Sequence, residues 1–273
     1  MPGDGPDGAF PSGALGSSPP IRSNSSHRGR DVEHRTALIT GAGSGMGRAI
    51  AEDLARAGLR VALVGRDRAK LEAVKAGLGD AGASCRVEPC DVADRAAVAA
   101  MVERVLDDFG SIDILVCNAG INIPNRSLEV LDPADWDRLI ATNLTGAFNL
   151  VHFVLPSMRR HRRGLIVQIA SIAGIRASVL GGTAYSASKF GQNALAWCIG
   201  REEREHGIRS TAIHPGEVET PILDRRPVPV SAERRAQILQ PEDVARAVRF
   251  LAELPARAHV PELIIKPTVD DFA

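Results

Sequence analysis

Tyrosine and lysine are scarce in this sequence. Its 273 residues include a single tyrosine, Tyr185, and only four lysines, although arginine occurs 29 times. One of the four lysines, Lys189, stands four residues after that tyrosine. Positions i and i+4 of an α-helix lie on one face, about 5–6 Å apart. The two rare side chains therefore project together if the stretch "AYSASK" is helical.

An excess of charge of either sign is also absent. The chain has 33 basic and 33 acidic residues and a pI of about 7.1, so nothing indicates a nucleic acid or an anionic membrane as partner. No apolar run approaches the roughly 18 residues of a membrane span. The N-terminus lacks the charged start and apolar core of a secretory signal. We therefore expect a soluble, cytoplasmic protein.

The four cysteines lack the spacing of a metal site or a redox pair. Cys85, Cys90, Cys117 and Cys198 form neither a CxxC motif nor a zinc-like pattern. They fall in predicted strands, at a strand end or in a predicted helix, and buried reduced cysteine behaves as a small apolar residue. We expect four buried thiols and no metal ion.

The chain divides into a tail and one domain. Residues 1–32 are rich in Pro, Gly and Ser and poor in large apolar residues, which predicts a disordered tail. From Thr36 onward, short apolar strands alternate with amphipathic helices, which is typical of βαβ units. Residues 33–273 therefore predict a single α/β domain of Rossmann type, a doubly wound parallel sheet with helices on both faces.

The predicted elements follow this alternation along the domain. Strands are expected at 36–40, 60–65, 85–90, 112–118, 164–170, 208–215 and 262–267. Helices are expected at 48–58, 67–80, 94–110, 133–161, 184–206 and 241–254.

A glycine turn, "TGAGSGMG" at 40–47, follows the first strand and opens the first helix. Its glycines are Gly41, Gly45 and Gly47, a spacing that differs from the common GxGxxG pattern. Glycine permits a positive φ and a close backbone approach, and free N–H groups at a helix start attract a pyrophosphate. The turn predicts dinucleotide binding, and the alternative is a tight turn that uses glycine for geometry alone.

The end of the second strand bears on which dinucleotide binds. NAD sites usually place a carboxylate here for the ribose 2′-hydroxyl, whereas an arginine suits a 2′-phosphate. The strand ends at Gly65 and is followed by Arg66, while Asp67 is explained by capping of the next helix. This favours NADP(H), and NAD(H) stays possible. Asp91, after the third strand, either accepts a hydrogen bond from the amino group of adenine or caps the next helix.

Six motifs in order resemble those of the short-chain dehydrogenase/reductase family. They are the glycine turn at 40–47, "CNAG" at 117–120, Asn143 in "ATNLTG", Ser171 in "IASIAG", "YSASK" at 185–189 and "PGEVET" at 215–220. The resemblance covers about residues 35–255. It implies an oxidoreductase that transfers a hydride between a nicotinamide cofactor and a ketone or secondary alcohol.

The resemblance implies a catalytic set of Asn143, Ser171, Tyr185 and Lys189. Tyr185 would exchange a proton with the reacting oxygen as general acid or base, and Ser171 would hydrogen-bond that oxygen. A lysine cation beside a phenol favours phenolate and lowers its pKa from about 10. The ammonium of Lys189 would also hold ribose hydroxyls, and Asn143 would hold a water that links Lys189 to solvent.

The implied cofactor-binding residues come from the glycine turn, the strand ends and the later motifs. They are Gly41, Ser44, Gly45, Met46, Gly47, Arg66, Asp91, Val92, Asn118, Ala119, Gly120, Tyr185, Lys189, Pro215, Gly216, Val218 and Thr220. The resemblance also implies a homodimer or homotetramer packed through the helices that hold Asn143 and Tyr185.

Three features depart from the family pattern. Cys117 replaces an asparagine that braces the strand, which leaves the chemistry intact. Ser171 and Tyr185 are fourteen residues apart, about one more than is common, and this lengthens the loop at 172–183. The last strand lacks the usual glycine-rich ending, so subunit contacts there do not follow from the resemblance.

The resemblance implies a small-molecule substrate with a carbonyl or alcohol group, and no motif in the sequence specifies which compound it is. A substrate lid is expected at about 216–240, together with the 172–183 loop. Its arginines, Arg225, Arg226, Arg234 and Arg235, would either meet an anionic substrate or be solvated. A different class of function is a catalytically silent NADP-binding sensor or scaffold of the same fold. Lyase or epimerase chemistry on nucleotide sugars usually needs a longer substrate domain.

Overall fold

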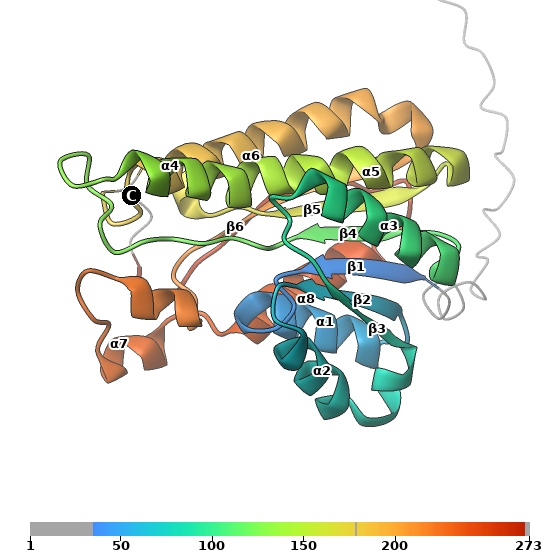
Figure 1. Ribbon diagram of the computed structural model, residues 1–273, viewed down its shortest axis with the longest axis horizontal. Helices are drawn as coiled ribbons and strands as arrows, with labels where there is room; N and C mark the ends of the chain where they lie inside the picture. Colours follow the sequence, from blue (N-terminus) through green and yellow to red (C-terminus); the bar gives the residue numbers. More distant parts are fainter. Residues whose placement is uncertain (1–34, 178, 271–273) are drawn as a thin grey trace, which may run out of the picture.

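A parallel sheet of seven strands forms the middle layer of the fold (Figure 1). The computed structural model describes residues 35–177 and 179–270, so the tail predicted at 1–32 lies outside the described residues. The strand order is β3-β2-β1-β4-β5-β6-β7, and neighbouring strands are parallel. The strands are β1 Thr36–Thr40, β2 Arg60–Gly65, β3 Cys85–Pro89, β4 Ile114–Cys117, β5 Gly164–Ile169, β6 Ile208–Pro215 and β7 Glu262–Ile265.

Helices cover both faces of this sheet (Figure 1). One face carries α1 Gly45–Arg56, α2 Arg68–Gly77 and α8 Pro241–Glu253. The other carries α3 Arg95–Phe109, α5 Gly146–His161 and α6 Thr183–Glu202, with α4 Pro133–Ile140 packed against α6. Successive strand residues point to opposite faces, so Ile39 packs in the α1 and α8 core while Leu38 packs in the α3 and α5 core. The predicted doubly wound parallel sheet is confirmed.

The strand order places a crevice at one edge of the sheet. β1 lies between β2 and β4, so the chain first moves outward to β3 and then returns to the other side of β1. Such a reversal leaves a crevice at the carboxyl ends of the two strands. Thr40 and Cys117 end β1 and β4, so the glycine turn at 41–47 faces the segment at 118–120.

The helix predicted at 133–161 contains one irregular turn. A π-helical turn, Ala141–Thr145, joins α4 to α5 and carries Asn143. Single π turns are frequent at functional sites. The whole run is long and apolar enough to span a membrane by length and composition. Its α5 part buries side chains such as Leu150 and Val154 against the sheet, which accounts for that composition.

Some elements were not predicted, and one expectation about cysteine is wrong. The 3₁₀ helices Gly79–Ser84 and Pro221–Arg225 and the helix α7 Ala232–Gln237 have six residues or fewer, too few to show a helical period. Cys198 is exposed on α6, whereas the other three cysteines are buried and all four are free. Cys198 lies on the outer face of its helix, and one isolated position gave no sign of which face that was.

Candidate active site

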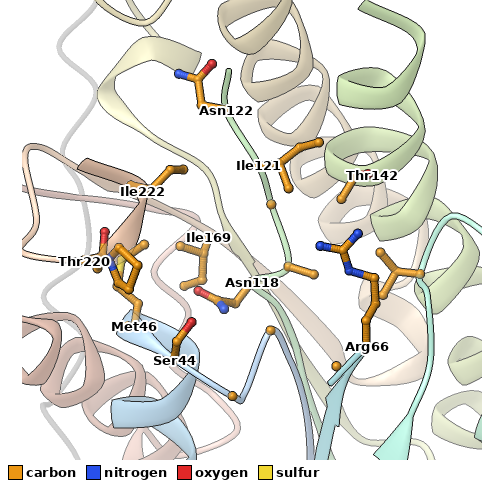
Figure 2. A pocket seen from close by; sticks show the side chains of 18 of the residues that line it. Ser44, Met46, Arg66, Asn118, Ile121, Asn122, Thr142, Ile169, Thr220 and Ile222 are labelled. Atoms are coloured by element: carbon orange, nitrogen blue, oxygen red, sulfur yellow. The ribbon is translucent and has the colours of Figure 1, made fainter. Parts of the chain in front are cut away.

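A cavity of about 790 Å³ opens at the carboxyl ends of the central strands. Figure 2 shows some of the side chains around it, including Ser44, Arg66 and Asn118. Most of the sequence-predicted site residues line this cavity. They are Gly41, Ser44, Gly45, Met46, Arg66, Asp91, Val92, Asn118, Ala119, Gly120, Tyr185, Lys189 and Thr220.

Other predicted residues lie outside the lining. Gly216 packs against the end of β7, where its N–H donates to the Ile265 carbonyl at 2.7 Å. Val218 is buried in the core beside α8. The remaining residues outside the lining are Gly47, Pro215, Asn143 and Ser171. Cofactor contact by Gly47, Pro215, Gly216 and Val218 stays a prediction, as do the catalytic roles of Asn143 and Ser171.

The glycine turn is held against the end of β4 by hydrogen bonds. The Thr40 hydroxyl accepts from the backbone N–H groups of Asn118 and Ala119, each at 3.0 Å, and the Asn118 amide donates to the Thr40 carbonyl at 2.8 Å. Gly41 and Gly45 have φ values of 66° and 52°, which other residues rarely adopt. The turn therefore keeps a fixed shape around the cavity floor.

The N-terminus of α1 provides a place for an anion. Ser44 occupies the N-cap position, but its side chain caps no backbone N–H, and the first turn contains no acidic residue. Uncapped N–H groups and the positive end of the helix dipole attract phosphate. Ser44, Gly45 and Met46 line the cavity at this point. The residues present therefore fit the pyrophosphate of a dinucleotide.

A substitution at Gly47 would test how much cofactor binding depends on the close packing of the glycine turn against Asn118. A Cβ at Gly47 would lie 2.3 Å from the Gly41 carbonyl oxygen and 2.4 Å from the Asn118 amide nitrogen. We expect Gly47→Ala to weaken NADPH binding by about 10-fold or more, since overpacking costs about 1–3 kcal/mol and displaces the turn. Gly77→Ala, where a Cβ meets nothing within 4 Å, is the matched control. Titration calorimetry would contradict the expectation if both variants bound NADPH equally well.

Three charged residues at the end of β2, Arg66, Asp67 and Lys70, line the cavity. The Lys70 ammonium lies 3.9 Å from the Asp67 carboxylate, whereas Arg66 forms no ion pair within the part of the chain that the structure describes. The Asp67 carboxylate accepts from the Lys70 backbone N–H at 3.2 Å, which agrees with its predicted role as a helix cap. The Asp91 carboxylate accepts from the Ala93 N–H at 3.0 Å and also lines the cavity, so both of its predicted roles stay open.

The phenol of Tyr185 is held in its neutral form. Burial raises the pKa of Tyr185, and a hydrogen bond with Ser171 and the charge of Arg126 oppose this rise without reversing it. Lys189 was expected to lower this pKa. The structure assigns that influence to Arg126, because the ammonium of Lys189 donates to Ile169 and Gln192 and lies 5.6 Å from the centroid of the Tyr185 ring.

Lys189 is buried beneath the cavity floor. Its Nζ donates to the Ile169 carbonyl at 2.8 Å and to the Gln192 side-chain oxygen at 2.7 Å, which leaves one of its three N–H bonds for a ligand. Burial lowers the pKa of Lys189 to about 7. Gln192 in turn donates to the Gln168 side-chain oxygen on β5 at 3.3 Å. No motif in the sequence indicated either glutamine, although Gln192 follows Lys189 by one helical turn.

Asn143 and Ser171 brace the site from behind. The Asn143 amide is fully buried, accepts from the Ile121 N–H at 2.8 Å and donates to the Ile121 carbonyl at 3.0 Å. It also donates to the Ser188 hydroxyl at 3.1 Å, which ties the 120–123 segment to α6. The Ser171 carbonyl accepts from the His214 ring at 3.0 Å. The water expected at Asn143 stays a prediction.

Arg126 is a functional candidate that no sequence motif indicated. Its buried guanidinium donates to three backbone carbonyls, those of Ile123 and Leu180 at 2.8 Å and of Arg225 at 2.7 Å. These carbonyls belong to three separate segments, two of which line the cavity through Ile123 and Arg225. Gly182 makes room for this contact, since a Cβ there would lie 2.6 Å from the Arg126 Cβ. An arginine in an irregular loop carries no sequence signal of this role.

Comparison with known proteins agrees with this geometry. A cis-4-hydroxycyclohexanecarboxylate dehydrogenase of Sinomonas cyclohexanicum is 36% identical over 229 residues, 82% of this chain and 91% of the relative. The closed form of a serine dehydrogenase complexed with NADP⁺ has a TM-score of 0.80 and 30% identity, over 87% of this chain and 97% of that chain. A 3-ketoacyl-(acyl-carrier-protein) reductase from Brucella melitensis complexed with NADH has a TM-score of 0.78 and 30% identity, over 86% and 98%.

The family itself follows from a match that spans most of the domain. Residues 35–228 match the short chain dehydrogenase family, a range that runs from β1 past Thr220 and includes the whole cavity floor. This range contains the glycine turn, Asn143, Ser171 and the Tyr185/Lys189 pair, in that order along the chain. The chain therefore belongs to the short-chain dehydrogenase family.

Proposed function

We propose that this protein is an NADP(H)-favouring oxidoreductase that transfers a hydride between the nicotinamide and a ketone or secondary alcohol, with Tyr185 as general acid or base. The observation that carries the proposal is that Tyr185 and Lys189 line the same cavity as the uncapped N-terminus of α1. In reduction, the carbonyl carbon gains the hydride and its oxygen gains a proton. Tyr185 can supply the proton, and the anion site at the start of α1 can hold the cofactor that supplies the hydride.

The electrostatics of Tyr185 suit proton donation. Because burial raises its pKa, the phenol stays protonated at neutral pH and can protonate a carbonyl oxygen. The Ser171 side chain lies close enough to oppose this rise in the pKa of the phenol and would steady charge on the same reacting oxygen. Arg126 favours the phenolate that remains once the proton has left. The oxidation of an alcohol uses the same residues in reverse.

The cavity supports a phosphorylated dinucleotide as the hydride carrier. When bound, NADP(H) supplies or accepts the hydride. The start of α1 would hold its pyrophosphate, and the remaining N–H bond of Lys189 would hold a ribose hydroxyl. Arg66 and Lys70 would meet a 2′-phosphate, which favours NADP(H) over NAD(H). The NADP⁺ and NADH complexes of the two structural relatives support both cofactors as candidates.

The segment at about 216–240 supports the proposed lid. Thr220, Ile222 and Arg225 line the cavity, and α7 lies in the same segment. The names of the relatives support a carbon bearing a hydroxyl or carbonyl group as the reacting centre. Cis-4-hydroxycyclohexanecarboxylate and serine both carry a hydroxyl group, and a 3-ketoacyl group carries a carbonyl.

The test is a steady-state assay of nicotinamide oxidation and reduction with a panel of ketones and secondary alcohols. We expect turnover of at least one carbonyl compound and a higher kcat/KM with NADPH than with NADH. A silent sensor or scaffold would instead bind NADPH tightly and turn over no member of the panel. That result would contradict the proposed function, and a tenfold tighter binding of NADH than of NADPH would reverse the cofactor preference.

A further inference from the structure

Three of the four arginines in the lid segment are neutralised by carboxylates. Arg226 forms an ion pair with Glu217. Arg234 also pairs with Glu217, with its Nε 2.8 Å from the carboxylate, and it pairs with Asp270 at 2.5 Å. Arg235 pairs with Glu219 at 2.5 Å and with Asp224 at 2.8 Å. Their charges therefore serve to hold the lid segment together.

Arg225 differs from its neighbours in both partner and position. Its guanidinium forms no ion pair or hydrogen bond with any residue the structure describes, and it lines the cavity. Its backbone is nevertheless fixed, since the Arg225 carbonyl accepts from the Arg126 guanidinium at 2.7 Å. Arg225 is solvent-exposed and lines the cavity, so the lid segment offers one unpaired cation there from a fixed backbone position.

The anchor places this cation at the Tyr185 end of the cavity. Arg126 is close enough to Tyr185 for its charge to act on the phenol, and it also holds the Leu180 carbonyl in the loop before α6. The phosphates of the cofactor have other partners, namely the N-terminus of α1 and Arg66. The nicotinamide ring is a cation when oxidised and neutral when reduced, so it offers a guanidinium no negative charge. The remaining source of negative charge at this end is the substrate.

We propose that Arg225 binds an oxyanion on the substrate, a carboxylate or a phosphate, so that the enzyme acts on a carbonyl or alcohol compound that carries such a group. This inference rests on the proposed function and names the substrate class of the same site. A guanidinium binds planar carboxylates and phosphates through two parallel N–H bonds. A charge-assisted pair of this kind is expected to favour the charged substrate over a neutral analogue by about 10- to 100-fold.

The experiment compares matched pairs of substrates in the full-length protein with NADPH. The carboxylate arm uses 3-oxobutanoate, 4-oxopentanoate and 4-oxocyclohexanecarboxylate, each against its own uncharged amide. The phosphate arm uses dihydroxyacetone phosphate against dihydroxyacetone. The measured quantity is the ratio of kcat/KM for the charged compound to kcat/KM for its neutral partner. We expect wild-type protein to prefer the charged member in one arm. The arm that shows the preference identifies the oxyanion.

Two lid variants separate a binding role from a structural one. Arg225→Gln should lower the charged-to-neutral ratio by about 10- to 100-fold, and Arg225→Lys should restore part of it. Arg235→Gln removes the same charge from the lid segment, but from a residue already paired with Glu219 and Asp224, and should leave the ratio as in wild type. A general disturbance of the lid would lower kcat/KM for the charged and the neutral substrate alike, so it would leave their ratio unchanged.

The outcomes distinguish this inference from the proposed function. Turnover of neutral ketones without any preference for a charged member would overturn the role of Arg225 and leave the oxidoreductase in place. An unchanged ratio in Arg225→Gln, together with a raised KM for NADPH, would make Arg225 a cofactor ligand and also overturn it. The absence of turnover for every compound, charged or neutral, would reject both.

Discussion

Replacing Tyr185 with phenylalanine is expected to lower kcat by about 10²- to 10⁴-fold, the contribution typical of a positioned general acid. The ring keeps its place between α6 and the 120–123 segment, where it packs with Leu139 and Ile123. Only the hydroxyl that protonates the reacting oxygen is lost. The KM for NADPH should change little, because the α1 N-terminus and Lys189 remain in place.

The single tyrosine provides a direct control for this experiment. The ultraviolet absorbance of tyrosinate in the folded protein reports Tyr185 alone, because the chain has one tyrosine. With the pKa of Tyr185 raised, its titration should begin above the ordinary value of about 10, and the signal should vanish in Tyr185→Phe. Wild-type kcat in the variant would contradict the role of Tyr185, and a titration below the ordinary value would contradict the assigned electrostatics.

The fold and the gathering of most predicted cofactor residues around one cavity could be predicted because their signals are local. An apolar stretch such as "TALIT" shows a strand buried on both faces, and the glycine turn directly after it marks the start of α1. Parallel strands bring their carboxyl ends to one edge, so motifs such as Gly41–Gly47 and Asn118–Gly120 meet without further information. The match of most predicted cofactor residues to one cavity follows from this geometry.

The features that escaped prediction depend on contacts between distant segments. Arg126 reaches the carbonyls of Leu180 and Arg225, 54 and 99 residues away, and nothing in its own loop indicates these partners. The direction of the Tyr185 pKa shift was also missed, because burial outweighs any nearby cation and burial is a property of the assembled fold. The i+4 spacing placed Lys189 beside Tyr185 but could not show that its ammonium bonds to Ile169 and Gln192.

Replacing Lys189 with methionine is expected to lower kcat/KM by about 10²-fold or more, since the ammonium positions the cofactor near the reacting carbon. The same change should alter how stability depends on pH. Burial lowers the pKa of Lys189 to about 7 in the folded protein, from an ordinary value of 10.5. Between these two values the unfolded chain binds one more proton than the folded protein, so this group makes wild-type stability rise with pH.

The size of this effect follows from the pKa difference. Between pH 6 and pH 9, Lys189 should raise the unfolding free energy of wild type by about 2–3 kcal/mol, at 1.36 kcal/mol for each pH unit above the folded pKa. Lys189→Met should lack this rise, whereas Lys75→Met on α2 should keep both the rise and the activity. Urea unfolding at several pH values measures it. Parallel pH profiles for wild type and Lys189→Met would show that the buried ammonium titrates normally, and the cation would then be present in the site throughout this range.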